Sequence, residues 1–177
     1  MMFPIGKRNA TDDPTEMVSA CHERIRNFLT LADRLVSDEP ATDDDVRGTA
    51  AAVARYFREA LPQHERDEDD SIAPRVRGMM RMVDQALDDM HAQHLVMHPL
   101  VESLVAICDR IAAAAEAHVA RAVERDDLAR VLADLHPRMA SHLAAEETFV
   151  FPAIEHLPFA ERAALVGEMR ARRVPIP

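Results

Sequence analysis

Residues 141–152 read SHLAAEETFVFP, and residues 63–74, which read QHERDEDDSIAP, carry the same pattern earlier in the chain. Each stretch has a histidine, a glutamate four residues later, a second acidic residue directly after it, and a closing proline. The two histidine–glutamate pairs are His64 with Glu68 and His142 with Glu146. Residues four apart on a helix lie on the same face. The repeat therefore predicts two helices that each present a histidine and a glutamate to one shared site.

Both pairs continue an apolar helical stripe. The stripes are Val53, Phe57 and Leu61 before His64, and Leu128, Leu132, Leu135 and Met139 before His142. Burying a carboxylate without a partner costs several kcal/mol or shifts its pKa strongly, and few cationic residues fall on these stripes. A surface pair with no ligand role would explain one such motif better than two. A bound metal satisfies both carboxylates and the imidazoles together.

The composition favours a helical protein that is packed by aliphatic side chains. Of the 177 residues, 48% are hydrophobic but only 4% are aromatic, and there are four glycines. The net charge of −10 argues against nucleic acid or an anionic membrane as a partner. Two cysteines, Cys21 and Cys108, are too few for a disulfide framework or a thiolate zinc site. With no secretory signal pattern and no apolar run of membrane-spanning length, we expect a soluble, cytoplasmic protein.

The hydrophobic periodicity predicts an all-α fold, an antiparallel up-down four-helix bundle with a short C-terminal fifth helix. We expect a single domain over residues 1–177, with the bundle at about 13–157 after an irregular lead-in at 1–12. The expected helices run over about 13–37, 44–70, 79–118 and 159–172, and a fourth helix carries a stripe from Leu128 to Phe149, with the loop before it at Glu124–Asp127. Asp13 is the expected N-cap of the first helix. Pro62 and Pro99 are expected to kink the second and third helices.

The remaining helices add further histidines to the stripes. His22 lies on the first helix, and His94 and His98 lie one turn apart on the third, where His91 is an alternative to one of that pair. With the two repeated motifs, the set is five imidazoles and two carboxylates. A tetrahedral zinc takes only four ligands, whereas two adjacent six-coordinate metals with bridging carboxylates can use them all. Imidazole with carboxylate suits iron, manganese or zinc, and the lack of thiolates argues against copper(I) or an iron–sulfur cluster.

At these residues the sequence resembles the hemerythrin-like (HHE-domain) family of non-haem di-iron four-helix bundles. The resemblance covers about residues 13–157 and comprises a lone histidine, H-x3-E, H-x3-H and H-x3-E on successive helices, with the tail EETFVFP. It implies two iron ions, although zinc or manganese can replace iron in a purified sample. It also implies that His94, His98 and His142 hold one iron, that His22 and His64 hold the other, and that Glu68 and Glu146 bridge them. Dioxygen would bind reversibly at the iron with two histidines.

The chain departs from the invertebrate oxygen carriers of that family, which have an aspartate five residues after the last histidine. Here Glu146 follows His142 by four residues and Glu147 by five. The H-x3-E form is commoner in bacterial and regulatory members, whose roles include oxygen or nitric oxide sensing, iron sensing and repair of iron centres. The resemblance thus implies a di-iron protein that binds dioxygen or nitric oxide for storage, delivery or sensing. The alternatives are iron sensing, iron-centre repair, or a di-iron oxidase or ferroxidase.

The expectation that this chain is not an enzyme rests on its motifs. Ferritin-type and oxidase-type di-iron bundles use Glu-x-x-His pairs, and none occurs in this sequence. No other catalytic motif accompanies the metal site. The other titratable residues have simpler roles, Cys21 as a packing residue and the acids beside the motifs as solvated helix faces, one of which can accept from an imidazole N–H. Those acids are Asp67, Asp69, Asp70 and Glu147, and the histidines expected on the surface are His118, His136 and His156.

Overall fold

The computed structural model describes residues 12–37 and 40–173, and over these residues it contains helices and no strand. The expected all-α class is confirmed. The elements are α1 (Pro14–Val36), α2 (Asp43–Glu59), α3 (Leu61–Asp67), the π-helical turn η1 (Glu68–Ile72), α4 (Ala73–Val76), α5 (Arg81–Ala113), α6 (Ala117–Ala145), the π-helical turn η2 (Glu146–Val150), α7 (Phe151–Glu155) and α8 (Phe159–Arg172). The lead-in expected at 1–12 lies, apart from Asp12, outside the described residues.

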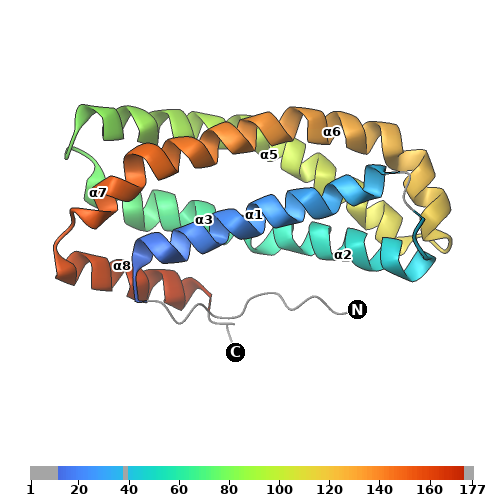
Figure 1. The fold of residues 1–177 in the computed structure, drawn as a ribbon, viewed down its shortest axis with the longest axis horizontal. Helices are drawn as coiled ribbons and strands as arrows, with labels where there is room; N and C mark the ends of the chain where they lie inside the picture. Colours follow the sequence, from blue (N-terminus) through green and yellow to red (C-terminus); the bar gives the residue numbers. More distant parts are fainter. Residues whose placement is uncertain (1–11, 38–39, 174–177) are drawn as a thin grey trace.

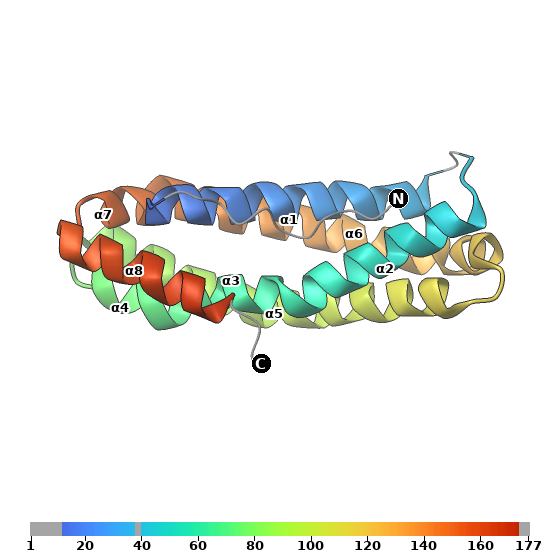
Figure 2. The ribbon, with the colours of Figure 1, turned by 90° about the horizontal axis from the view of Figure 1, so that it is seen from below.

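The long helical segments lie side by side, and their connections alternate between the two ends of the molecule (Figure 1). In the turned view, α1 and α6 form one layer while α2, α3 and α5 form the other (Figure 2). The most extensive contacts join α5 to α6 and to α2, and α1 packs on both α6 and α2. The short α8 packs on α1, α3 and η1. Residues far apart in the sequence therefore meet in the middle of the molecule.

The first helix begins where its sequence predicts. The Asp13 carboxylate accepts hydrogen bonds from the backbone N–H groups of Thr15 at 2.8 Å and Glu16 at 3.2 Å. Pro14 follows at the first helical position, where its missing N–H has no cost. The predicted interruption at Pro62 is also confirmed, because α2 ends at Glu59 and α3 begins at Leu61. The helix α5, by contrast, continues through Pro99.

The boundary between the third and fourth predicted helices was wrong. We expected the loop at 124–127, but the chain turns at 114–116. The turn is fixed by α2, since Arg47 donates to the carbonyl groups of Ala112, Ala114 and Ala115 at 3.0, 2.6 and 3.2 Å. Asp43 accepts from the N–H of Ala117 at the start of α6. The charged run at 124–127 is part of α6, where Asp126 and Asp127 are exposed and the half-buried Glu124 binds Arg110 of α5.

Two apolar clusters fill the interior, and the buried polar residues lie between them. One cluster joins the C-terminal half of α1 to α2, α6 and the C-terminal part of α5. The other joins the N-terminal half of α1 to α4, α7, α8 and the N-terminal part of α5. The buried polar side chains are His22, His64, Asp67, Glu68, Ser71, His94, His142 and Glu146. The stripe predicted to end at Phe149 shifts in η2, where Val150 is buried and Phe149 is only half-buried.

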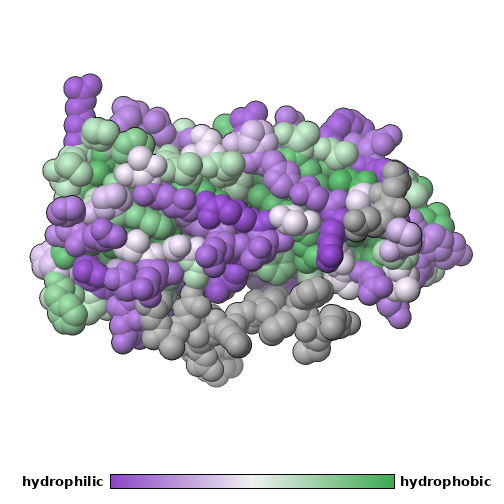
Figure 3. Space-filling view, viewed as in Figure 1, coloured by the Kyte–Doolittle hydropathy of each residue, from purple (hydrophilic) through white to green (hydrophobic). Residues whose placement is uncertain are grey.

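The outer surface is mixed in character. On the face shown in Figure 3, hydrophilic residues are interspersed with hydrophobic ones along the exposed sides of the helices. Among the described residues, no helix combines the length and the apolar character that crossing a membrane requires.

Candidate metal centre

Six of the seven predicted ligands converge among the buried polar residues between the two apolar clusters. Each comes from a different element, and each is at most 4% exposed. The ligand atoms fall into two groups, within each of which all atoms lie within 4.8 Å of one another. The first group is His22, His64, Glu68 and Glu146, and the second group is Glu68, His94 and His142. Glu68 belongs to both groups.

The carboxylate of Glu68 faces the two groups with different oxygen atoms. Its Oε1 lies 2.6 Å from Nε2 of His64, in the first group. Its Oε2 lies 3.2 Å from Nε2 of His94, in the second group, and 3.8 Å from Nε2 of His142. A carboxylate with one oxygen toward each of two ligand sets has the orientation of a bridge between two metal ions.

Several of these atoms have no hydrogen-bond partner although they are buried. They are both oxygens of Glu68, both ring nitrogens of His64, and Oε1 of Glu146. The close approach of His64 and Glu68 therefore lacks the alignment of a hydrogen bond. Two ligand atoms that are each about 2.1 Å from one metal, at roughly a right angle, lie about 3 Å apart. The spacing, the orphaned atoms and the nitrogen–oxygen donor set all fit metal ions such as iron, manganese or zinc.

A π-helical turn begins at each glutamate of the repeated motif, Glu68 and Glu146, and it explains the repeat in the sequence. The N–H of Ala73 bonds the carbonyl of Glu68, and the N–H of Phe151 bonds the carbonyl of Glu146, in both cases five residues back. Ala73 is followed by Pro74, and Phe151 is followed by Pro152. A proline lacks an N–H, and in a regular helix its ring would clash with the carbonyl group four residues earlier. The wider π turn relieves that clash. Such turns occur often at functional sites.

The second π turn also places an aromatic wall beside the first group. The ring of Phe151 lies 5.2 Å from the ring of His22, centroid to centroid. His22 is further oriented by its outer nitrogen, because Nδ1 lies 2.8 Å from Oε1 of Glu147. Arg26 donates to the same oxygen at 2.6 Å. Glu147 is therefore the acidic residue that accepts from an imidazole, as expected for one of the four acids beside the motifs.

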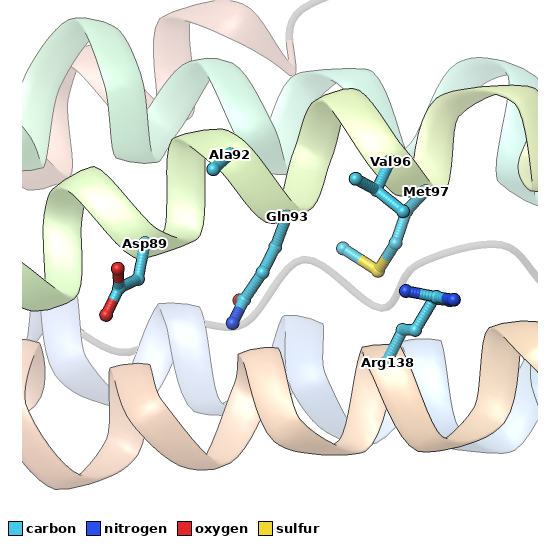
Figure 4. Close-up of a pocket in the computed structure, with 6 residues that line it drawn as sticks. All are labelled: Asp89, Ala92, Gln93, Val96, Met97 and Arg138. Carbon is cyan, nitrogen blue, oxygen red and sulfur yellow. The ribbon is translucent and has the colours of Figure 1, made fainter.

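The sequence did not identify Gln93, which has the same role for the second group. Its Oε1 lies 3.1 Å from Nδ1 of His142. Figure 4 shows the side chain extending from α5 toward α6, in a surface pocket between these helices. An uncharged glutamine beside a histidine motif looks like an ordinary surface residue of a helix. Only the position of α6 shows that its amide oxygen meets an imidazole.

His98 is the predicted ligand that the structure does not bring to the cluster, so the expected H-x3-H ligand pair needs correction. The ring of His98 is parallel to that of His94, at 6.3 Å between centroids. Its side chain is 48% exposed, and its Nε2 lies 3.0 Å from Oε2 of Glu65 on the surface. The alternative residue, His91, is also exposed. Of the three histidines of α5, only His94 is buried, and His98 has its partner, Glu65, at the surface.

Burial and neighbouring charges shift the pKa values of three histidines of the cluster in different directions. Burial opposes a charge on His64, but the carboxylate of Glu68, the neighbouring Cys21 and, last, Glu146 outweigh it and hold the pKa of His64 well above its usual value. Burial likewise opposes a charge on His94, but Glu68 raises its pKa. Burial and the positive charge of His94, against the attraction of Glu68, lower the pKa of His142 to about 4. The Nε2 atoms of His94 and His142, 3.2 Å apart, can thus share one proton.

Metal binding is therefore expected to release protons. A metal ion must displace the protons that His64 and His94 hold up to a higher pH than an ordinary histidine. Affinity should fall by about tenfold per pH unit for each proton displaced as the pH is lowered from 8 to 6. Competition with a coloured chelator at several pH values measures this slope. An affinity that does not change over this range would contradict the assigned protonation states.

The positions of His94 and His98 make different predictions for alanine variants. We expect His94→Ala to remove one ligand of the second group and to lower the metal content of the purified protein. We expect His98→Ala to keep the metal content, because the replaced ring binds Glu65 at the surface. Elemental analysis of both variants, prepared in parallel, tests this. Equal losses in the two variants would show that His98 ligates the metal as the sequence pattern predicts.

Two other buried groups, Asp67 and Cys21, lie beside the centre, and the prediction for Asp67 is wrong. Asp67 was expected on a solvated face, but it is fully buried and paired with Arg172, at 2.8 Å, and with Arg173. Cys21 is buried as expected, yet Arg24 donates to its sulfur at 3.1 Å. Burial alone would raise the pKa of this thiol. Contact with His64 and the positive charges of Arg24 and Arg173 outweigh burial and lower the pKa to about 7. The arginines come from the same helix and from the distant C-terminal end of α8.

Comparison with known proteins agrees with this centre. The sequence model of the hemerythrin HHE cation-binding domain matches residues 13–117, which is more than half of the chain. No curated protein and no solved structure gives a match. The matched stretch contains His22, His64, Glu68 and His94, and the tertiary structure adds His142 and Glu146 from beyond its end. The chain thus belongs to the hemerythrin HHE cation-binding domain family.

Proposed function

We propose that this protein is a non-haem di-iron protein that binds dioxygen or nitric oxide, for storage, delivery or sensing. The observation that supports it best is the carboxylate of Glu68, whose two oxygens face two separate groups of buried ligand atoms. A shared carboxylate has this orientation when it joins two metal ions. Imidazole and carboxylate donors without a thiolate suit iron.

The surroundings of the ligands support a binding role. The cluster lies between two apolar clusters, which keep bulk water away from it. In the proposed arrangement the helical segments form an up-down antiparallel four-helix bundle, with α8 as the short fifth helix. The ligands then belong to four facing segments of the bundle, and the protein supplies fixed geometry and dry walls. The bound iron supplies the affinity for a diatomic molecule.

Reconstitution under anaerobic conditions tests the proposal. Metal-free protein is loaded with ferrous iron, freed of excess metal, and analysed for iron and protein. We expect about two irons per chain, because two ligand groups share Glu68. Exposure to air or to nitric oxide should then produce a new visible absorption band that disappears when the gas is removed.

Two results would reject this function. Iron in the expected amount without any adduct of dioxygen or nitric oxide would show that the centre has another role, such as iron sensing. Repeated turnover of ferrous iron or of an oxidisable substrate would show that the protein is a di-iron oxidase. Zinc-loaded protein is the matched control, because the same ligands then hold a metal that has no redox chemistry.

A further inference from the structure

The two ligand groups differ in the residue that lies against the outward-facing ring nitrogen, Nδ1, of one of their histidines. Nδ1 of His22, in the first group, faces the carboxylate of Glu147 at 2.8 Å. Nδ1 of His142, in the second group, faces the amide oxygen of Gln93 at 3.1 Å. The first acceptor is an anion and the second is neutral. An acceptor on the outer nitrogen fixes the tautomer and increases the basicity of the ligating nitrogen, and a carboxylate does so more strongly.

Gln93 lies where it can control the ring of His142. Its side chain extends from α5 toward α6 and lines a pocket of about 290 Å³ between the two helices (Figure 4). The hydrogen bond places the ring proton of His142 on Nδ1, which donates to Gln93. Nε2 of His142 then carries a lone pair toward the interior, where Nε2 of His94 lies 3.2 Å away. Without this acceptor, the other tautomer would place a proton on the atom that must bind the metal.

The groups also differ in their number of ligands. Four residues converge in the first group and three in the second, and the second shares Glu68 with the first. His98 does not add a fourth, because it binds Glu65 at the surface. More ligands and an anionic acceptor both favour tighter binding in the first group. A metal in the first group also leaves Oε2 of Glu68 directed toward the second.

We propose that the two metals bind in order, the first group before the second, and that Gln93 is the positioning residue that controls occupancy of the second group. This inference rests on the proposed two-metal centre but not on any reaction of that centre with gases. It assigns to an uncharged side chain control over the affinity of the second group for its metal. Glu147 has the corresponding role for the first group.

Titration of the metal-free protein with cobalt(II) ions tests the order of binding. Isothermal calorimetry gives the affinities, and the visible bands of bound cobalt report the ligand field of each step. The wild-type chain should show two steps of different affinity. In Gln93→Leu, which has no acceptor at this position, the second step should weaken by about 10- to 100-fold while the first is unchanged. In Gln93→Glu, which restores an acceptor and adds a charge, the second step should be tighter than in the wild type.

The matched control is Glu147→Gln, which gives the first group a neutral acceptor. It should weaken the first step and bring the two affinities closer together. The inference is overturned if the wild type shows two equal steps, if Gln93→Leu binds as the wild type does, or if Gln93→Glu leaves the second step unchanged. The Gln93→Glu result decides the matter where Gln93→Leu fails to fold, as judged by circular dichroism. Ordered binding of cobalt by a protein whose iron form gives no gas adduct would reject only the proposed function.

Discussion

Replacement of Glu68 by alanine is expected to abolish binding of both metals. Its two oxygens face His64 in the first group and His94 in the second, so one substitution removes a ligand from each. Loss of an outer partner of a metal ligand costs about 10- to 100-fold in affinity, and loss of a shared ligand should cost more at both positions. Iron analysis after anaerobic loading should therefore fall from about two per chain to near zero.

A carboxylate one turn earlier provides the matched control for Glu68. Glu65 lies three residues before it on the same helical segment, but its carboxylate faces His98 on the surface. We expect Glu65→Ala to keep the metal content of the wild type. Retention of two metals by Glu68→Ala would show that Glu68 does not bridge the groups. Loss of only one would show that the two groups do not share it.

Removal of the two arginines at the C-terminal end of α8, Arg172 and Arg173, is expected to lower the free energy of unfolding more than removal of a surface arginine does. Asp67 is fully buried, and its two oxygens bind Arg172 and Arg173. In the double variant Arg172→Ala, Arg173→Ala, the carboxylate stays buried without a positive partner. Breaking a buried ion pair in this way costs about 3 to 5 kcal/mol. Urea unfolding of the metal-free protein should show a decrease of this size in the free energy of unfolding.

Two further variants separate the buried charge from a general effect of the helix. Arg170→Ala, which removes a guanidinium that binds the exposed Asp12, should cost less than about 1 kcal/mol. Adding Asp67→Leu to the double variant removes the unpaired charge and should recover most of the lost stability. If the double variant is as stable as the wild type, the contacts of Asp67 with α8 do not contribute to the stability of the fold.

The repeated motif allowed much of the centre to be predicted. Residues four apart share a helix face whatever the rest of the chain does, so the His–Glu pairs were placed together before the fold was known. The apolar stripes before each pair indicated that this face is buried. The six side chains that converge in the two groups were all among the ligands predicted from the sequence. The N-cap at Asp13 and the break at Pro62 were also predictable, because both depend only on residues close together in the sequence.

Contacts between distant residues decided what the sequence left open. The sequence places His94 and His98 equivalently, and only Glu65 of α3 shows that His98 binds at the surface. The turn at 114–116 has no local signal, since its position depends on Asp43 and Arg47 of α2.

The local sequence thus determined which residues face the interior, because helical periodicity is a property of the chain itself. The tertiary structure decided their partners, including Gln93 for His142 and the α8 arginines for Asp67. A hydrogen bond or an ion pair forms only between groups that packing brings within about 3 Å, and no spacing along one helix specifies the neighbouring helix.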